Sequence, residues 1–208
     1  PQGGGMGGGG PTATAGGALN DPGGFARDGQ QTLAAAAVSR IAADMTVFFD
    51  DGSPNLAIAM ALPMDLPMTA VTNAPSIAAA LIDKPLVNVI LIGGLIDRQV
   101  GGALGAKAMR DMEPLSPDLC ILGACGVDIA AGGTVFGFED AEFKRFVATK
   151  SRQVLVAVTS DKFGTAAPHG VLSAADCGCL VVERDADPQM LARYHDLGCK
   201  TLVAGETE

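Results

Sequence analysis

The chain has 208 residues, of which 48% are hydrophobic and 18% charged. This is enough apolar material for one domain of ordinary size, with roughly 70% of the unfolded surface buried on folding. The formal net charge of −9, with only 14 scattered lysines and arginines, excludes a bare nucleic-acid binder, because phosphate neutralisation requires clustered positive charge. We find neither a signal-peptide pattern nor an apolar run of membrane-spanning length, so we expect a cytoplasmic protein that does not bind membranes.

Residues 1–30 differ in composition from everything that follows. They are dominated by Gly, Pro, Ala and Thr and cannot bury enough apolar surface to fold alone. No Gly-Lys-Ser/Thr follows the glycines, so a Walker-type phosphate loop is excluded. We therefore expect a Gly-rich linker or arm at 1–30 and one α/β domain at 31–208.

From residue 31 onward, apolar runs of strand length alternate with helical patterns. The predicted strands are 45–49, 68–72, 87–92, 119–122, 154–158, 180–182 and 200–204. The predicted helices are 31–43, 54–62, 75–82, 103–112, 139–150 and 188–197. The stretches 123–138 and 159–176 are predicted as loops. Continuous apolar strands separated by helices indicate a mostly parallel, Rossmann-like sheet with helices on both faces.

The first predicted strand ends abruptly in Asp50-Asp51-Gly52-Ser53-Pro54. Gly52 permits a left-handed turn, Ser53 suits the N-cap of the next helix, and Pro54 suits its first turn. Such a turn directs unpaired N–H groups and the positive end of a helix at one point, which favours an anion. The alternative is a plain strand-to-helix turn without a ligand.

Other polar groups and glycines also follow predicted strands. They are Thr72-Asn73, Gly93-Gly94, Gly123 to Asp128, and Thr159 to Lys162. Asn73 is also expected to cap the helix that follows it. Because parallel sheets bind ligands beyond the carboxyl ends of their strands, we expect these groups to share one pocket.

Each charged candidate has a functional and a structural interpretation. Asp50 and Asp51 could position a sugar hydroxyl or transfer protons, or they could be turn residues that cap a helix. Asp128 could bind hydroxyls, or it could be a solvated turn aspartate. Asp140 and Lys144 stand one helical turn apart, so they can pair either within a site or as a solvated surface pair. Lys162 could meet an anionic ligand, or it could be an exposed loop lysine.

The cysteines and histidines give no sign of a metal site or a catalytic arrangement. The odd number of cysteines and their C-x4-C and C-x-C spacings do not match zinc motifs, so we expect buried free thiols in a reducing compartment. We expect neither a metal nor a cofactor.

Several motifs, taken in order from about residue 31 to 204, resemble the effector-sensing domain of DeoR-family transcriptional repressors. They are FFDDGSPNLAIAMAL, VTNAPSIAAAL, VNVILIGGLIDRQVGGALG, PDLCILGACGVD, GFEDAEFKR and VTSDKFG. That family is similar in fold to ribose-5-phosphate isomerase and the CoA transferases. The resemblance implies a homo-oligomeric sensor that binds a phosphorylated sugar or related small metabolite and controls operator DNA.

The family's site residues can be carried over only where this sequence matches its motifs. The matched positions are Asp50, Gly52 and Ser53; Thr72 and Asn73; Gly93 and Gly94; Gly123, Gly126 and Asp128; Asp140, Ala141, Lys144 and Arg145; and Lys162, Phe163 and Gly164. Three positions depart from the pattern. Asp51 and Pro54 replace a Ser and a Thr of the phosphate-binding turn, and Thr159 stands where the family often has Asp. The first two weaken anion binding, which makes a less charged ligand an alternative.

The expected roles follow from this resemblance. Gly52, Ser53 and Lys162 would hold the anionic end of the effector, while Asp50, Asn73, Asp128 and Lys144 would read hydroxyls or close the pocket. Operator DNA would be bound only through an N-terminal helix-turn-helix domain, for which the sequence shows no pattern.

Two alternatives remain open, and the first is a sugar-phosphate isomerase-like enzyme of the same fold. In that enzyme Asp50, Asp128 or Asp140 would be the base, and Lys144 or Lys162 would stabilise developing negative charge. The second alternative is a degenerate domain that only oligomerises.

Overall fold

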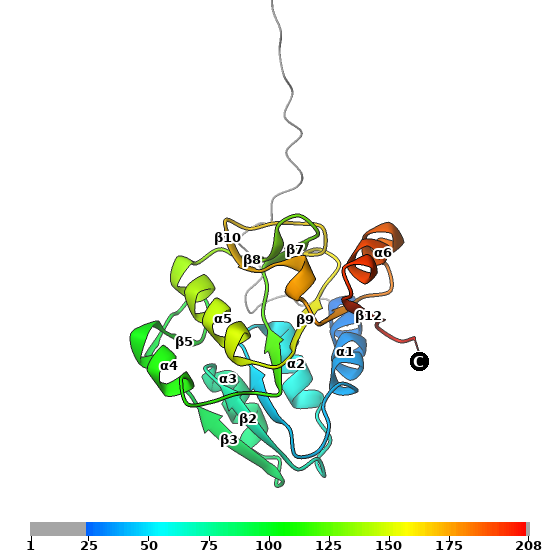
Figure 1. The fold of residues 1–208 in the computed structure, drawn as a ribbon. Helices are drawn as coiled ribbons and strands as arrows, with labels where there is room; N and C mark the ends of the chain where they lie inside the picture. Colours follow the sequence, from blue (N-terminus) through cyan, green and yellow to red (C-terminus); the bar gives the residue numbers. More distant parts are fainter. Residues whose placement is uncertain (1–23, 207–208) are drawn as a thin grey trace, which may run out of the picture.

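The computed structural model describes residues 24–206, so most of the predicted arm lies outside the described residues (Figure 1). Seven strands form one sheet in which every neighbouring pair is parallel. In spatial order they are β12 (Lys200–Val203), β11 (Cys179–Val182), β9 (Val154–Val158), β6 (Leu119–Leu122), β1 (Thr46–Phe49), β2 (Met68–Thr72) and β3 (Val87–Leu91). The prediction of a mostly parallel α/β sheet is confirmed.

Helices cover both faces of this sheet, as predicted. Side chains of α1 (Gly24–Val38), α2 (Ser53–Ala61) and α3 (Pro75–Ile82) pack on one face. Those of α4 (Gly105–Met112), α5 (Phe138–Lys150) and α6 (Pro188–Asp196) pack on the other. The strands other than the edge strand β3 supply both cores, because successive side chains of a strand point to opposite faces.

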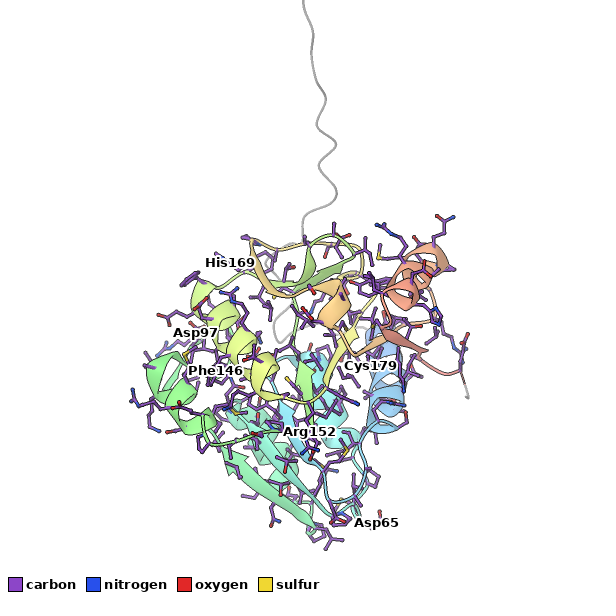
Figure 2. All side chains as sticks on the ribbon, in the orientation of Figure 1. Asp65, Asp97, Phe146, Arg152, His169 and Cys179 are labelled. Atoms are coloured by element: carbon purple, nitrogen blue, oxygen red, sulfur yellow. The ribbon has the colours of Figure 1, made fainter. Side chains whose placement is uncertain are left out.

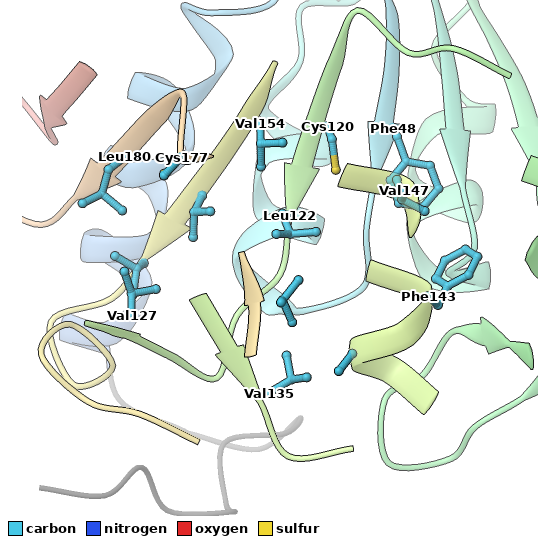
Figure 3. Packing of buried hydrophobic residues seen from close by; sticks show 14 of the residues in the cluster. Phe48, Cys120, Leu122, Val127, Val135, Phe143, Val147, Val154, Cys177 and Leu180 are labelled. Carbon is cyan, nitrogen blue, oxygen red and sulfur yellow. The ribbon is translucent and has the colours of Figure 1, made fainter. Parts of the chain in front are cut away.

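Strand β1 shows this alternation clearly. Val47 and Phe49 lie in the core under α1 to α3, whereas Phe48 lies in the core under α5. Phe48 meets Phe143 of α5 edge to face with ring centroids 6.1 Å apart, and Val147 lies beside this pair (Figure 3). Such an arrangement contributes about 0.5–1.5 kcal/mol beyond the burial of the two rings. It also fixes α5 over the carboxyl end of β1.

Two small antiparallel sheets were not predicted. One joins β7 (Gly126–Asp128), β8 (Gly132–Val135) and β10 (His169–Leu172), and it lies at the top of the view in Figure 1. The other is the hairpin of β4 (Leu95–Ile96) and β5 (Ala103–Leu104). A 3-10 turn, Ala174–Asp176, follows β10. Strands β7 and β8 are short and contain glycine, which is typical of loops, and β4 and β5 have only two residues each, too few for a strand pattern.

Two predicted helices have different bounds in the structure. Helix α1 begins at Gly24, within the stretch assigned to the arm, and ends at Val38 rather than at residue 43. The chain turns after α1, and Asp44 has a positive φ of 64° that no α-helix contains. The predicted helix 103–112 begins only at Gly105, because Ala103 and Leu104 pair with β4.

The largely apolar run of residues 87–92 predicts a buried strand, and this prediction is wrong for β3. It is the last strand of the sheet, and Ile90 and Leu91 are exposed. An edge strand with apolar side chains has the same largely apolar sequence as a central strand. The sequence pattern therefore did not show that β3 lies at the edge of the sheet.

Within residues 24–206, no helix combines the length and the apolar character needed to cross a membrane.

Candidate ligand-binding site

The turn after β1 contains the positive φ that was predicted at Gly52, but the predicted side-chain cap is not formed. Gly52 is the N-cap of α2 with φ +114°, which favours glycine. The exposed Ser53 is the first residue of the helix, and no side-chain hydrogen bond caps it, so the N-cap role expected of Ser53 is wrong. The side-chain amide of Asn55 donates instead to the carbonyl oxygens of Asp50, Asp51 and Ile121, at 3.0, 3.0 and 3.2 Å. Asn55 therefore ties the turn to the end of β6.

Lys144 of α5 lies at the centre of a buried group of carboxylates. Its Nζ donates to Oδ2 of Asp50 and, at 3.1 Å, to Oδ2 of Asp51. It also lies 3.1 Å from Oδ1 of Asp140, one helical turn away. The Lys144 side chain is only 2% exposed, so the interpretation of Asp140 and Lys144 as a solvated surface pair is wrong. We call Asp50, Asp51, Asp140 and Lys144 the carboxylate cluster.

The electrostatics of the cluster are unbalanced, because three carboxylates surround one ammonium group. Burial, and next the charge of Asp51, raise the pKa of Asp50 well above its usual range. Burial also raises the pKa of Asp140, against the opposing effect of Lys144. The three carboxylates hold the pKa of Lys144 well above its usual value, which outweighs the effect of burial. Lys144 is therefore charged, and Asp50 and Asp140 take up protons more readily than free aspartates.

These pKa shifts predict how stability depends on pH. The folded chain binds more protons than the unfolded chain between the usual aspartate pKa of 3.8 and the raised values of Asp50 and Asp140. This contribution to stability is therefore fully present below pH 3.8 and is lost as pH rises through the raised values. Urea unfolding between about pH 4 and pH 7 should show a smaller loss with rising pH in Asp140→Asn than in the wild type. Equal slopes in both proteins would contradict the assignment.

Asn73 lies beside the cluster, at the end of β2. Its backbone carbonyl accepts from the amide of Ala103 at 2.8 Å, and its Nδ2 donates to the carbonyl of Ala103 at 3.2 Å. The expected helix cap at Asn73 is wrong, because Ala74 is the N-cap of α3. Asn73 instead fixes the β4–β5 hairpin against the end of the sheet.

Two glycines let backbone approach this group closely. A Cβ on Gly102, in the hairpin loop, would lie 2.7 Å from Nδ2 of Asn73 and 3.4 Å from Oδ2 of Asp51. A Cβ on Gly123, after β6, would lie 2.6 Å from the carbonyl oxygen of Asp51. The amide of Gly123 donates to Oδ2 of Asp50 at 2.7 Å. A side chain at either position would therefore clash with the residues of this group.

The structure brings some predicted residues together and leaves others apart. Asp50, Asn73, Gly123, Asp140 and Lys144 meet at the adjacent ends of β6, β1 and β2. The order of the strands reverses here, since β2 and β3 lie on one side of β1 and the later strands β6, β9, β11 and β12 lie on the other. Such a switch point is where open parallel sheets bind ligands.

The remaining predicted residues lie around this centre. Gly94 has φ +153° and packs against the hairpin, while Gly93 lies near the ammonium of Lys107. The carboxylate of Asp128 accepts from the amides of its own loop at Ala130 and Ala131. Lys162 is half-buried and makes no ion pair with any residue between 24 and 206. These four were expected in one pocket, and none of them makes a direct contact with the carboxylate cluster.

A surface pocket of about 420 Å³ borders the hairpin. Its lining includes Leu95, Ile96 and Arg98 of the hairpin, together with Lys107 and Glu139. It contains no member of the carboxylate cluster, although Glu139 precedes Asp140 in α5. The hairpin thus approaches the cluster through Gly102 and lines the pocket with residues of both its strands.

Sequence reasoning assigned no role to Asn55 or Gly102. Asn55 is a polar residue in an otherwise apolar helix, which is a usable signal for a buried hydrogen bond. Gly102 is the second glycine of a pair. A glycine pair indicates that another segment packs closely against the backbone only when that segment is known. The five cysteines are free thiols, and four of them are buried as predicted, with Cys125 half-buried.

The structure is a parallel α/β domain with a buried polar cluster at the switch point of its sheet. The family model for the DeoR C-terminal sensor domain matches residues 26–184. This is well over half of the chain, which therefore belongs to the DeoR C-terminal sensor domain family.

Three characterised proteins are similar to this chain. GolR, a helix-turn-helix-type transcriptional regulator of Listeria innocua, is 25% identical over 178 residues, which are 84% of this chain and 69% of that protein. The glycerol-3-phosphate regulon repressor of Escherichia coli is 29% identical over 173 residues, 80% of this chain and 67% of that protein. GlpR of Haloferax volcanii is 30% identical over 137 residues, 66% of this chain and 53% of that protein. The chain thus spans about half to two thirds of the length of these relatives.

Solved structures that resemble the fold include ribose 5-phosphate isomerase A from Methanocaldococcus jannaschii and from Neisseria gonorrhoeae. Both have a TM-score of 0.49, at 12% and 15% identity respectively. They cover 66% and 65% of this chain, and 54% and 53% of their own chains.

Proposed function

We propose that this chain is the effector-sensing domain of a cytoplasmic transcription regulator and binds a sugar phosphate or related small metabolite at the carboxylate cluster. The family membership of residues 26–184 is the observation that carries the proposal. Two relatives are named as repressors of the glycerol-3-phosphate regulon and of the deoxyribose operon, which points to polyol phosphates and sugars. Because the chain carries a net charge of −9, we expect operator DNA to contact another part of the regulator.

The position of the cluster supports binding at this place. Asp50, Asn73 and Gly123 follow three adjacent strands at the switch point, and α5 supplies Lys144 and Asp140. An effector can bias DNA binding only if it binds one arrangement of the regulator better than another. The β4–β5 hairpin, held to Asn73 by two hydrogen bonds, is the element next to the cluster that would respond.

A thermal-shift screen tests the proposal. The panel consists of sugar phosphates, polyol phosphates and their unphosphorylated parents. A compound present at a hundred times its Kd should add about 2.7 kcal/mol to stability, or roughly 5–11 °C for a domain of this size. No shift with any compound would contradict the sensor function and favour the degenerate oligomerisation domain.

Binding without catalysis is the second part of the proposal. The similar characterised proteins are named as transcription regulators or repressors. Asp128, one of the bases considered for an isomerase-like enzyme, has its Oδ1 occupied by two loop amides. A compound that binds should therefore be recovered unchanged after prolonged incubation with the chain. Isomerisation that Asp50→Asn abolishes would support the enzyme instead.

We further propose that the domain forms a homodimer through β3. Leu86, Ile90 and Leu91 are 49%, 39% and 50% exposed at this edge of the sheet, and no charged residue occurs between residues 85 and 96. Exposed edge strands are usually protected by charge, as Lys200 protects β12 at the other edge. An uncharged strand can pair with its own copy about a two-fold axis without opposing like charges, even in a chain of net charge −9.

Ile90→Lys should convert this dimer to a monomer, because it places a charge on each copy of the paired edge. Light scattering after gel filtration measures the change. Leu197→Lys is the matched control, since Leu197 is 45% exposed beside β12 at the opposite edge of the sheet. A wild type that is monomeric at micromolar concentration, or an Ile90→Lys variant that stays dimeric, would refute pairing through β3.

A further inference from the structure

The carboxylate cluster has more negative charge than its lysine can neutralise. Asp50, Asp51 and Asp140 all lie within 3.1 Å of the same ammonium group. The Lys144 ammonium donates hydrogen bonds to Asp50 and Asp51, and it lies 3.1 Å from Oδ1 of Asp140. No other lysine or arginine between residues 24 and 206 forms an ion pair with Asp50, Asp51 or Asp140. A second anion entering this place would meet like charge in a poorly solvated environment.

The buried polar atoms at the carboxylate cluster that have no hydrogen-bond partner are all oxygens. Oδ1 of Asp50, Asn55, Asn73 and Asp140 are buried and accept no hydrogen bond within residues 24–206. Each of these four residues is at most 5% exposed. All four atoms are carboxylate or amide oxygens, so what they lack is a donor. Leaving such groups without partners is unfavourable, and a ligand that supplies donors would remove this cost.

Asp51 is the member of the cluster that a ligand can reach. Its side chain is 12% exposed, whereas those of Asp50 and Lys144 are 0% and 2% exposed. Its Oδ2 and the side chain of Asn73 both lie close to Gly102 of the hairpin. A ligand that displaced the Gly102 backbone would therefore meet the carboxylate of Asp51 and the amide of Asn73 together.

We infer that Asp51 is a specificity-determining residue: it selects effectors whose inner end carries hydroxyl or ammonium donors and excludes a phosphate from that end. This deepens the proposed function and rests on it. A phosphate elsewhere on the effector is compatible with the inference, provided that the end next to Asp51 donates hydrogen bonds and carries no negative charge.

The test compares the wild type with Asp51→Asn, which removes the charge and keeps the shape. Isothermal titration calorimetry is carried out with inorganic phosphate and with ribitol, an unphosphorylated polyol. We expect Asp51→Asn to bind inorganic phosphate at least ten times more tightly than the wild type and ribitol more weakly. Asp51→Ser should change the phosphate affinity in the same direction. Asp65→Asn is the matched control, because Asp65 is exposed and precedes β2, at the end of the parallel strands opposite to the carboxylate cluster (Asp65 is labelled in Figure 2).

Two results would overturn the inference. One is Asp51→Asn binding inorganic phosphate no more tightly than the wild type while it keeps the wild-type melting temperature; the other is ribitol binding Asp51→Asn as tightly as it binds the wild type. An equal gain in Asp65→Asn would show that only the net charge of the chain matters. The proposed function fails separately, if no compound of the thermal-shift panel stabilises the wild type.

Discussion

Lys144→Met is expected to lower the free energy of unfolding by about 3–5 kcal/mol, the usual result of removing one partner from a buried charge group. Lys144 is 2% exposed, and its removal leaves Asp50, Asp51 and Asp140 buried without a cation. For a domain of this size the melting temperature should fall by roughly 6–20 °C. Urea unfolding and calorimetry at neutral pH measure the two quantities.

The pH dependence of this loss identifies its cause. The carboxylates that remain are protonated more readily without the lysine, so the loss should shrink as pH falls toward about 4. Adding Asp51→Asn to Lys144→Met should recover part of the stability, because one of the unpaired charges is then absent. Lys150→Met, the same substitution at a half-buried position of α5, should change stability by less than about 1 kcal/mol. A loss of similar size in both single variants would show that the charge group contributes nothing specific.

Gly132→Ala should destabilise the small antiparallel sheet by roughly 2–4 kcal/mol, from backbone strain and from the shift needed to relieve a clash. Gly132 has φ +71°, and a Cβ there would lie 1.9 Å from the carbonyl oxygen of Leu172 in β10. The β8–β10 pairing should therefore open, which amide hydrogen exchange in β8 and β10 would detect. Gly133→Ala is the control, since a Cβ there meets the side chain of Leu172 at 3.7 Å. Equal destabilisation by both variants would contradict this account.

The large sheet could be predicted because its strands are apolar runs bounded by turn residues. Val154–Val158 is buried at all five positions, and its bounds agree with the prediction. Met68–Thr72 likewise agrees at both ends. The small sheet could not be predicted in this way, since β8 begins with two glycines and β7 has three residues. Its pairing depends on contacts between segments far apart in the chain.

The site could be predicted in part for similar reasons. The i, i+4 spacing of Asp140 and Lys144 predicted their pairing, but local spacing carries no information about burial. The contact between Lys144 and Asp50 joins residues 94 positions apart and depends on how α5 crosses the sheet. The resemblance to the DeoR family supplied both residues without that geometry. Lys162 and Asp128 were expected in the same pocket because each follows a strand and matches a family motif. The structure places them around the cluster rather than within it.

We propose above that the effector binds at the ends of β1, β2 and β6, beside the hairpin. The most direct measurement is a titration of the 15N-labelled chain with a compound found in the thermal-shift screen, followed by amide NMR spectra. We predict the largest shifts at Gly52, Asn73, Gly102 and Gly123. Shifts confined to the surface pocket around Leu95 and Lys107, with these four amides unchanged, would contradict the claim.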